Sequence, residues 1–279
     1  MKRTILSVAG LLFLSATMSS LAQEPQAVPA TAVPAATVAE IECSGFIPAS
    51  ALPEDFYIFD AADNDFHHPN HQFASGDYVY LRSRIGTMAG VGAEYRVVRP
   101  AKELMMRTSW YPGQTWSLRA LGKVYEDVGR VRVVSVTPQA AVAQVAFACG
   151  PIRLGDLALP HQARAIPEYT PSAGLDRFAL PNGKTVGTIT AAASNGGFLG
   201  VGSIAYVDIG EGNGARPGQR YRIFHMRRLF PAGGLLSAWQ TPRETIGELV
   251  ILSTQERSSV AIVVASVREI AAGDGIGLE

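Results

Sequence analysis

The sequence lacks an excess of charge of either sign. Its 279 residues include 24 basic and 24 acidic side chains. Removal of the first 22 residues, which resemble an export signal, would leave 22 basic and 24 acidic residues and a formal charge of −2. A surface with so little net charge has no general attraction for nucleic acids or anionic lipid. We therefore expect no nucleic-acid partner.

The short motifs that reveal many enzymes are also missing. The chain has no G-x-S-x-G elbow, no H-E-x-x-H helix, no Walker loop and no G-x-G-x-x-G after a buried strand. Asp77, Asp156 and Asp274 follow glycines at the edges of expected strands, and Asp208 lies within one. We interpret these residues as turn aspartates that accept hydrogen bonds from backbone amides. The sequence predicts a protein without catalysis and without a cofactor.

The N-terminal apolar run is too short for a membrane-spanning helix. Lys2 and Arg3 precede the run ILSVAGLLFLS, and small residues end at Ala22, as signal peptidase requires. We expect a signal peptide over residues 1–22, with a membrane anchor as the alternative. The mature chain would then have no membrane span and would lie in the periplasm or be associated with the outer envelope. Residues 23–40, rich in alanine and proline, predict a flexible linker.

The chain contains two cysteines, Cys43 and Cys149, which allow one intramolecular pairing. In an exported protein this predicts a disulfide, worth about 4 to 5 kcal/mol on the chain-entropy model. Two buried free thiols are the alternative. A catalytic thiol is disfavoured because neither cysteine has a histidine or a basic residue beside it to lower its pKa.

The strongest pattern is an internal duplication. A block from Gly76 aligns without gaps with a block from Gly202, and a second block from Gly129 aligns with one from Gly247. We expect two domains, residues 41–165 and 183–279, joined by a connector over 166–182. The matched identical pairs are Gly76/Gly202, Tyr80/Tyr206, Gly86/Gly212, Gly92/Gly218, Tyr95/Tyr221, Arg96/Arg222, Val142/Val260, Ala143/Ala261, Val145/Val263, Ile152/Ile270, Gly155/Gly273 and Asp156/Asp274.

The repeated blocks have the composition of β-strands. Short stretches rich in β-branched and aromatic residues alternate with turns containing glycine, proline, asparagine or aspartate. Glycines at fixed places suggest turns or bulges where a strand bends to close a small barrel. We predict an all-β protein of two tandem small β-barrels or sandwiches. The expected strands cover residues 78–82, 95–99, 131–136 and 141–147, then 204–209, 221–225, 249–254 and 260–267.

The order of these motifs resembles a known envelope repeat. The pattern is G-D-x-V-Y-L, a glycine-rich turn, G-x-x-Y-R-V-x-R, G-x-V-x-V and finally A-x-V with I-x-x-G-D. It is similar to the repeated domain that follows LysM modules in bacterial envelope proteins, and more distantly to the C-terminal domain of the flagellar assembly protein T. The resemblance implies a small non-catalytic β-domain of the periplasm or outer envelope. Because no LysM-like Y-x-V-x-x-G-D-T-L segment is found, it does not extend to direct peptidoglycan binding.

One loop is rich in metal-binding side chains. The stretch DNDFHHPNH contains three of the five histidines, and its last part, HHPNH, falls within a five-residue insertion of the first repeat. His67, His71 and Asp63 are chemically suitable ligands for zinc or copper. Pro69 prevents a helix that would place two imidazoles on one face. We favour a solvated polar loop and keep a metal site and a pH-sensitive contact as the alternatives.

All three tryptophans lie in the segments that separate the two matched blocks of each repeat. Aromatic and arginine side chains together are typical of recognition surfaces. Alternatively, these segments cover the barrel ends and the tryptophans seal the cores. The candidate binding residues are Trp110, Tyr111, Trp116, Arg227, Arg228 and Trp239.

Together these patterns predict an exported, non-catalytic binding or assembly module of the cell envelope. Its partner would be the cell wall or an envelope protein. Two other functions remain open: a metal-dependent enzyme that uses the His67 to His71 loop, and a structural spacer.

Overall fold

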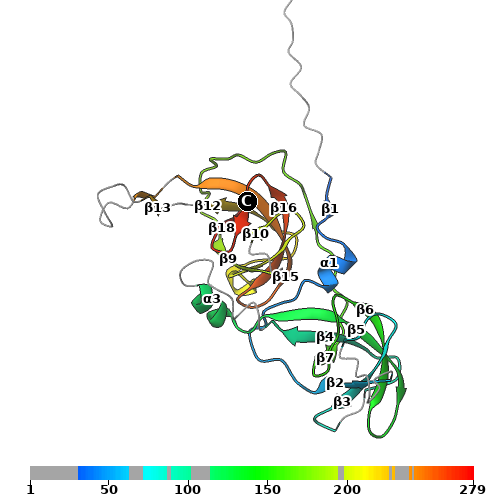
Figure 1. Ribbon diagram of the computed structural model, residues 1–279. Helices are drawn as coiled ribbons and strands as arrows, with labels where there is room; N and C mark the ends of the chain where they lie inside the picture. Colours follow the sequence, from blue (N-terminus) through cyan, green and yellow to red (C-terminus); the bar gives the residue numbers. More distant parts are fainter. Residues whose placement is uncertain are drawn as a thin grey trace, which may run out of the picture.

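The protein consists of two closed antiparallel β-barrels (Figure 1). The computed structural model describes residues 31–62, 72–86, 89–101, 114–193, 198–225, 228–229, 239–240 and 242–279. The predicted all-β fold is confirmed, and both units are barrels rather than sandwiches. Within the described ranges, no helix is long and apolar enough to cross a membrane.

Barrel 1 has six strands in the order β2-β3-β6-β5-β4-β7, and β7 closes the barrel by pairing with β2. Its apolar core comes from the inward-facing side chains of these strands, where valine, isoleucine and alanine alternate with polar residues that face outward. The strands are β2 (Phe56–Ala61), β3 (Tyr78–Ser83), β4 (Glu94–Pro100), β5 (Tyr125–Val136), β6 (Ala141–Ala148) and β7 (Leu157–Pro160).

Barrel 2 repeats this topology in the order β9-β11-β16-β15-β12-β18, and its core is a separate apolar cluster. Its strands are β9 (Val186–Ala192), β11 (Ile204–Val207), β12 (Arg220–His225), β15 (Glu244–Thr254), β16 (Ser259–Ser266) and β18 (Gly275–Leu278).

The duplication extends to the pairing register. Tyr80 pairs with Val142 in barrel 1, and the matched Tyr206 pairs with Val260 in barrel 2. The bulge in β4 after Val97 also recurs in β12. The first strands, β2 and β9, also match, with a larger difference in residue number than the aligned blocks: Asp60 pairs with Tyr80 as Ala191 pairs with Tyr206.

A glycine at the same place in each long strand allows the barrels to close. A Cβ atom at Gly129 would lie 2.5 Å from the Phe147 carbonyl oxygen, and one at Gly247 would lie 2.5 Å from that of Ala265. Any larger residue would therefore clash with the neighbouring strand. These are the first residues of the second matched block, which explains why the repeat begins with glycine in both copies.

Short elements connect and cover the barrels. Two of the short strand pairs, β10 with β17 and β13 with β14, belong to the second repeat. The remaining elements are β1 (Val33–Pro34), α1 (Val38–Glu42), α3 (Gln114–Leu121), β8 (Glu168–Tyr169), β10 (Phe198–Leu199), η1 (Glu211–Asn213), β13 (Arg228–Leu229), β14 (Trp239–Gln240) and β17 (Ile270–Ala271).

The expected flexible linker over residues 23–40 has a different structure in its described part. Strand β1 pairs with β8 in the connector, and Ala35 is buried against the outside of barrel 2. Helix α1 follows, and a capping box between Thr37 and Glu40 satisfies its first amides. The predicted signal peptide, residues 1–22, lies outside the described residues.

Candidate functional site

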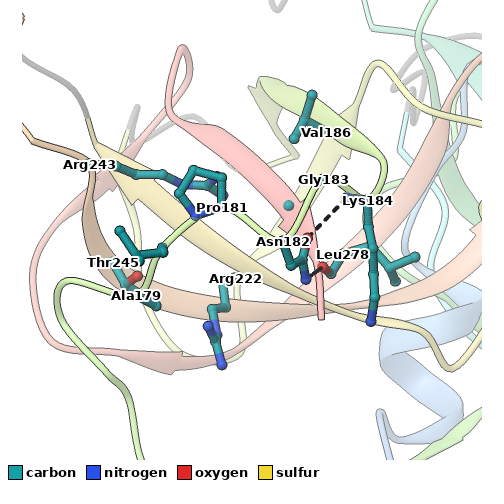
Figure 2. A pocket seen from close by; sticks show the side chains of 12 residues that line it. Ala179, Pro181, Asn182, Gly183, Lys184, Val186, Arg222, Arg243, Thr245 and Leu278 are labelled. Atoms are coloured by element: carbon teal, nitrogen blue, oxygen red, sulfur yellow. Dashed lines mark hydrogen bonds between the residues drawn. The ribbon is translucent and has the colours of Figure 1, made fainter.

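A shallow hollow of about 290 Å³ lies on barrel 2 between the end of the connector and strands β12 and β18 (Figure 2). Asn182 fixes the connector here: its amide donates to the Leu278 carbonyl at 2.8 Å, and its carbonyl accepts the Lys184 backbone amide at 3.1 Å. Lys184, Arg222 and Arg243 line the hollow together with apolar side chains. It can therefore receive a group that combines apolar surface with negative charge.

Arg243 lies over an aromatic ring. Its guanidinium carbon is 3.3 Å from the centre of the Phe224 ring. Two glycines of β18 leave space for the ring and the guanidinium group. A Cβ atom at Gly275 would lie 2.3 Å from the Phe224 ring, and one at Gly277 would lie 2.5 Å from an Arg243 nitrogen. Burial lowers the pKa of Arg243, and the nearby Arg222 lowers it further. Among the described residues, no carboxylate forms an ion pair with Arg243.

A larger hollow of about 770 Å³ adjoins the first, with Val186 in the lining of both. Asp208 lines it and accepts the Thr188 backbone amide at 2.5 Å. Burial raises the pKa of the Asp208 carboxyl, and the hydrogen bond from Thr188 partly opposes this shift. His225 separates this hollow from a third, of about 420 Å³, which Phe198 also lines.

His225 forms a close pair with Asp274, with 2.5 Å between Nδ1 and Oδ1. The same positions of barrel 1 hold Arg99 and Asp156, joined by two hydrogen bonds of 2.7 and 2.6 Å. In both barrels the carboxylate also accepts a backbone amide three residues earlier, as expected for the turn aspartates. The equivalent pair in barrel 1 indicates that His225 and Asp274 join two strand ends. This structural role explains the pair without a catalytic function.

Exposed apolar side chains lie at the first hollow, which Leu180 and Val186 line, and at Phe178 next to the lining residue Ala179. The exposed fractions are 60% for Phe178, 86% for Leu180 and 61% for Val186. We call this surface the β12–β18 face and define it by these three residues with Phe224 and Arg243. Contiguous exposed apolar side chains beside polar groups are typical of protein-binding surfaces.

The matching surface of barrel 1 is part of the apolar cluster that joins the two barrels. On β4 and β7, Val98, Leu157 and Leu159 stand where barrel 2 has Phe224, Gly275 and Gly277. We call this surface the β4–β7 face. Its side chains belong to one apolar cluster with residues of barrel 2, and β4 and β7 lie on the side of barrel 1 that points to barrel 2 (Figure 1). The barrel 2 members of the cluster are Ala191, Tyr206 and Val260, with Ala193 and Ile204 at its edge.

The segment before β2 lies between the two barrels. Tyr206 donates its hydroxyl to the Ser44 carbonyl at 3.1 Å, and Ser258 donates to the Ile47 carbonyl at 2.9 Å. Burial raises the pKa of Tyr206, so its hydroxyl remains a donor. In barrel 1 this segment pairs with the start of the long strand β5. In barrel 2 the connector lies in the equivalent place, because the Arg177 carbonyl accepts an amide near the start of β15. The residue that follows is the buried Ile47 in barrel 1 and the exposed Phe178 in barrel 2.

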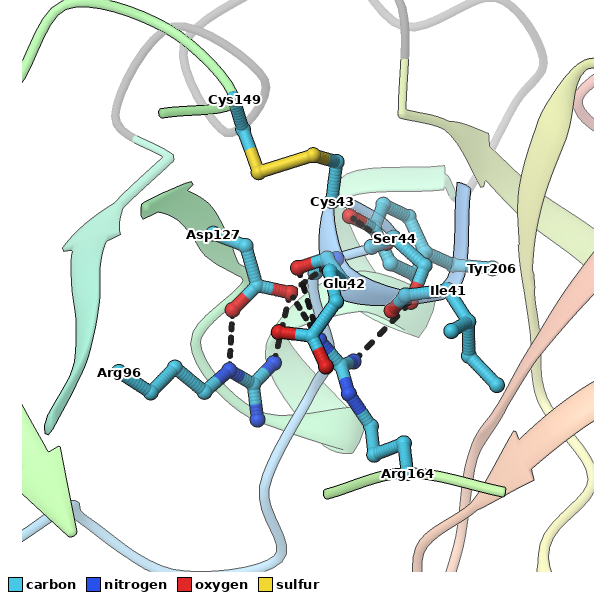
Figure 3. Close-up of polar contacts among 10 residues, drawn as sticks. Ile41, Glu42, Cys43, Ser44, Arg96, Asp127, Cys149, Arg164 and Tyr206 are labelled. Atoms are coloured by element: carbon cyan, nitrogen blue, oxygen red, sulfur yellow. Dashed lines mark hydrogen bonds and ion pairs between the residues drawn. A yellow bond between two sulfur atoms is a disulfide. The ribbon is translucent and has the colours of Figure 1, made fainter. Parts of the chain in front are cut away.

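A buried carboxylate holds this segment on barrel 1 (Figure 3). Asp127 accepts the Gly45 amide at 2.9 Å, an Arg164 nitrogen at 3.0 Å, and two nitrogens of Arg96. Arg164 also donates to the Glu42 carbonyl at 2.8 Å. Burial lowers the pKa of Arg164, and the negative charge of Asp127 opposes this shift. The cluster thus joins four parts of the chain.

The predicted disulfide is confirmed and secures the same segment. Cys43 at the end of α1 is bonded to Cys149 at the end of β6, with 5.5 Å between the Cα atoms. No signal in the sequence pointed to the Asp127 cluster, because its three charged side chains are far apart in the chain and Asp127 has no charged counterpart: the matched residue is Thr245.

None of the predicted aromatic and arginine residues has a side chain among those that the structure describes. Trp110, Tyr111 and Arg227 lie outside the described residues. Trp116 lies in α3, and Arg228 and Trp239 lie on the paired strands β13 and β14, but only their backbone positions are described. Their predicted role in binding stays a prediction.

The predicted metal ligands Asp63, His67 and His71 also lie outside the described residues. In the part of the chain that the structure describes, no group of three or more histidine, cysteine or acidic side chains could hold a metal ion. No protein-family model matches the chain, and no curated protein is similar enough to count as a match. The resemblance to the LysM-associated repeat therefore stays a prediction too.

Proposed function

We propose that the chain is an exported, non-catalytic binding or assembly module of the cell envelope that binds a partner protein through the β12–β18 face. One observation carries the proposal: the matching β4–β7 face of barrel 1 is already buried in the apolar cluster that joins the two barrels, together with the segment before β2 and α3. The two repeats thus carry equivalent surfaces. The surface on barrel 2 has three hollows and the exposed side chains of Phe178, Leu180 and Val186. The disulfide fits an oxidising compartment, which supports export.

The test is capture of envelope proteins by purified chain from Gln23 onward, with cell-wall sacculi in a parallel sedimentation assay. The double variant Leu180→Asp with Val186→Asp places two charges on the β12–β18 face without opening a core. Because buried apolar residues dominate binding energy, we expect its affinity for the captured partner to fall at least about tenfold.

The matched control is Val91→Asp, which alters a side chain that is 69% exposed outside the β12–β18 face. It should bind like the wild type. Equal capture by the double variant and the control would refute a role for this face. If neither proteins nor sacculi are enriched, the spacer function becomes the better account.

A further inference from the structure

We propose that the chain assembles head to tail, with the β12–β18 face of one copy docked on barrel 1 of a second copy. The surface that would receive it is the β3–β6 face, defined by Asp60, Tyr78, Tyr80 and Val142 on strands β2, β3 and β6. This inference rests on the proposed function and names the partner, a second copy of the chain.

The first argument is the geometry of the contact within one chain. Barrel 1 contributes its β4–β7 face, whereas barrel 2 contributes a different surface on β9, β11 and β16. Such a contact between unlike surfaces of the same domain is heterologous and leaves one surface of each kind at the ends. The strands β2 and β3 lie at one end of the molecule, and β12 and β18 lie on the side of barrel 2 away from barrel 1 (Figure 1). A second copy can therefore continue the arrangement.

The second argument is that the β3–β6 face of barrel 1 keeps two residue types that, in barrel 2, take part in the contact between the barrels. Tyr80 and Val142 match Tyr206 and Val260, which are only 2% and 1% exposed and belong to the apolar cluster that joins the two barrels. In barrel 1 the same two residues are partly exposed, and the adjacent Tyr78 is 40% exposed. Side chains of identical type thus lie partly exposed at the positions that form the contact within the chain.

The third argument is charge. Within the chain, Tyr125 of barrel 1 and Ala191 of barrel 2 are members of one apolar cluster. At the proposed contact the matched residues are Arg243 on the β12–β18 face and Asp60 on the β3–β6 face. Two members of the apolar cluster within the chain are thus matched by opposite charges at the proposed contact. Complementary charges favour this pairing of faces and disfavour two like faces meeting.

The test is sedimentation velocity of the chain from Gln23 onward, from nanomolar to high micromolar concentration. Leu180→Asp changes the β12–β18 face, and Tyr78→Asp changes the β3–β6 face; both side chains are exposed, so both variants should fold. We expect the wild type to form oligomers that grow with concentration and each variant alone to remain monomeric. A mixture of the two variants should form a heterodimer, because each supplies the intact face that the other has lost.

The mixture separates this arrangement from a symmetric dimer, in which neither variant can rescue the other. Val91→Asp is the control and should assemble like the wild type. A monomeric wild type, oligomers that both variants retain, or a mixture that stays monomeric would each overturn the proposal. If the wild type is monomeric but Leu180→Asp loses an envelope partner that the control keeps, only self-assembly fails. If no binding depends on this face, the proposed function fails as well.

Discussion

Asp208 is an acidic side chain whose surroundings oppose its charge. Burial raises its pKa above the ordinary value of 3.8, so the folded state holds the proton more tightly than the unfolded state. The contribution of this group to stability is therefore greatest at acid pH and is lost as the pH rises through the folded-state pKa. Asn keeps the oxygen that accepts the Thr188 amide but has no charge. We expect Asp208→Asn to be more stable than the wild type at neutral pH.

Urea unfolding at a series of pH values measures this effect. The advantage of Asp208→Asn should shrink as the pH falls towards and below 3.8. Asp77→Asn, in a turn where the carboxylate accepts the Ala74 amide at 2.8 Å, controls for the loss of one negative charge. An Asp208→Asn variant that is less stable than the wild type at neutral pH would contradict the prediction.

Single residues were predictable where their role is local. The turn aspartates Asp77, Asp156 and Asp274 accept backbone amides three residues earlier, as their positions after glycine predict. The ion pairs of Asp156 and Asp274 were not predictable, because their partners come from a strand far away in the sequence. The alignment still held one signal, since Arg99 and His225 occupy the same position of the repeat.

At the scale of elements, the disulfide connects α1 to barrel 1 across a sequence separation of 106 residues. A cross-link that closes so long a loop restricts the unfolded chain strongly. We expect the double variant Cys43→Ser with Cys149→Ser to lose about 4 to 5 kcal/mol of unfolding free energy. Urea denaturation measures the loss, and reduced wild-type protein should match the double variant. A loss below about 1 kcal/mol would show that other contacts hold α1 in place.

The predicted strands are all present because alternating apolar residues and glycine turns mark them. The strands that complete each barrel, β2 with β7 and β9 with β18, were not predicted. β7 and β18 are only four residues long, and Gly275 and Gly277 weaken the pattern in β18. Alanine and proline suggested a flexible segment before barrel 1, yet Thr37 and Glu40 form a capping box whose T-x-x-E pattern was present in the sequence.

At the scale of the whole molecule, the duplication was visible because ungapped identities survive in both copies. The contact between the barrels was not, because it combines side chains from segments that no local pattern connects. The same comparison of copies identifies the candidate surfaces: positions that are buried in one barrel and more exposed in the other, such as Ile47 against Phe178 and Tyr206 against Tyr80. Such differences emerge only after both environments are known.

Asp127 determines how the parts of the molecule are held together, because its buried carboxylate compensates Arg96 and Arg164 and accepts the Gly45 amide. Asp127→Asn keeps the size of the side chain but leaves two partly buried guanidinium groups without their counter-charge. We expect a loss of about 3 to 5 kcal/mol in unfolding free energy, measured by urea denaturation. Glu94→Gln is the matched control: it removes a carboxylate whose ion pair is about one third exposed, and should cost less than about 1 kcal/mol. Equal costs for the two variants would mean that the Asp127 cluster does not secure the segment between the barrels.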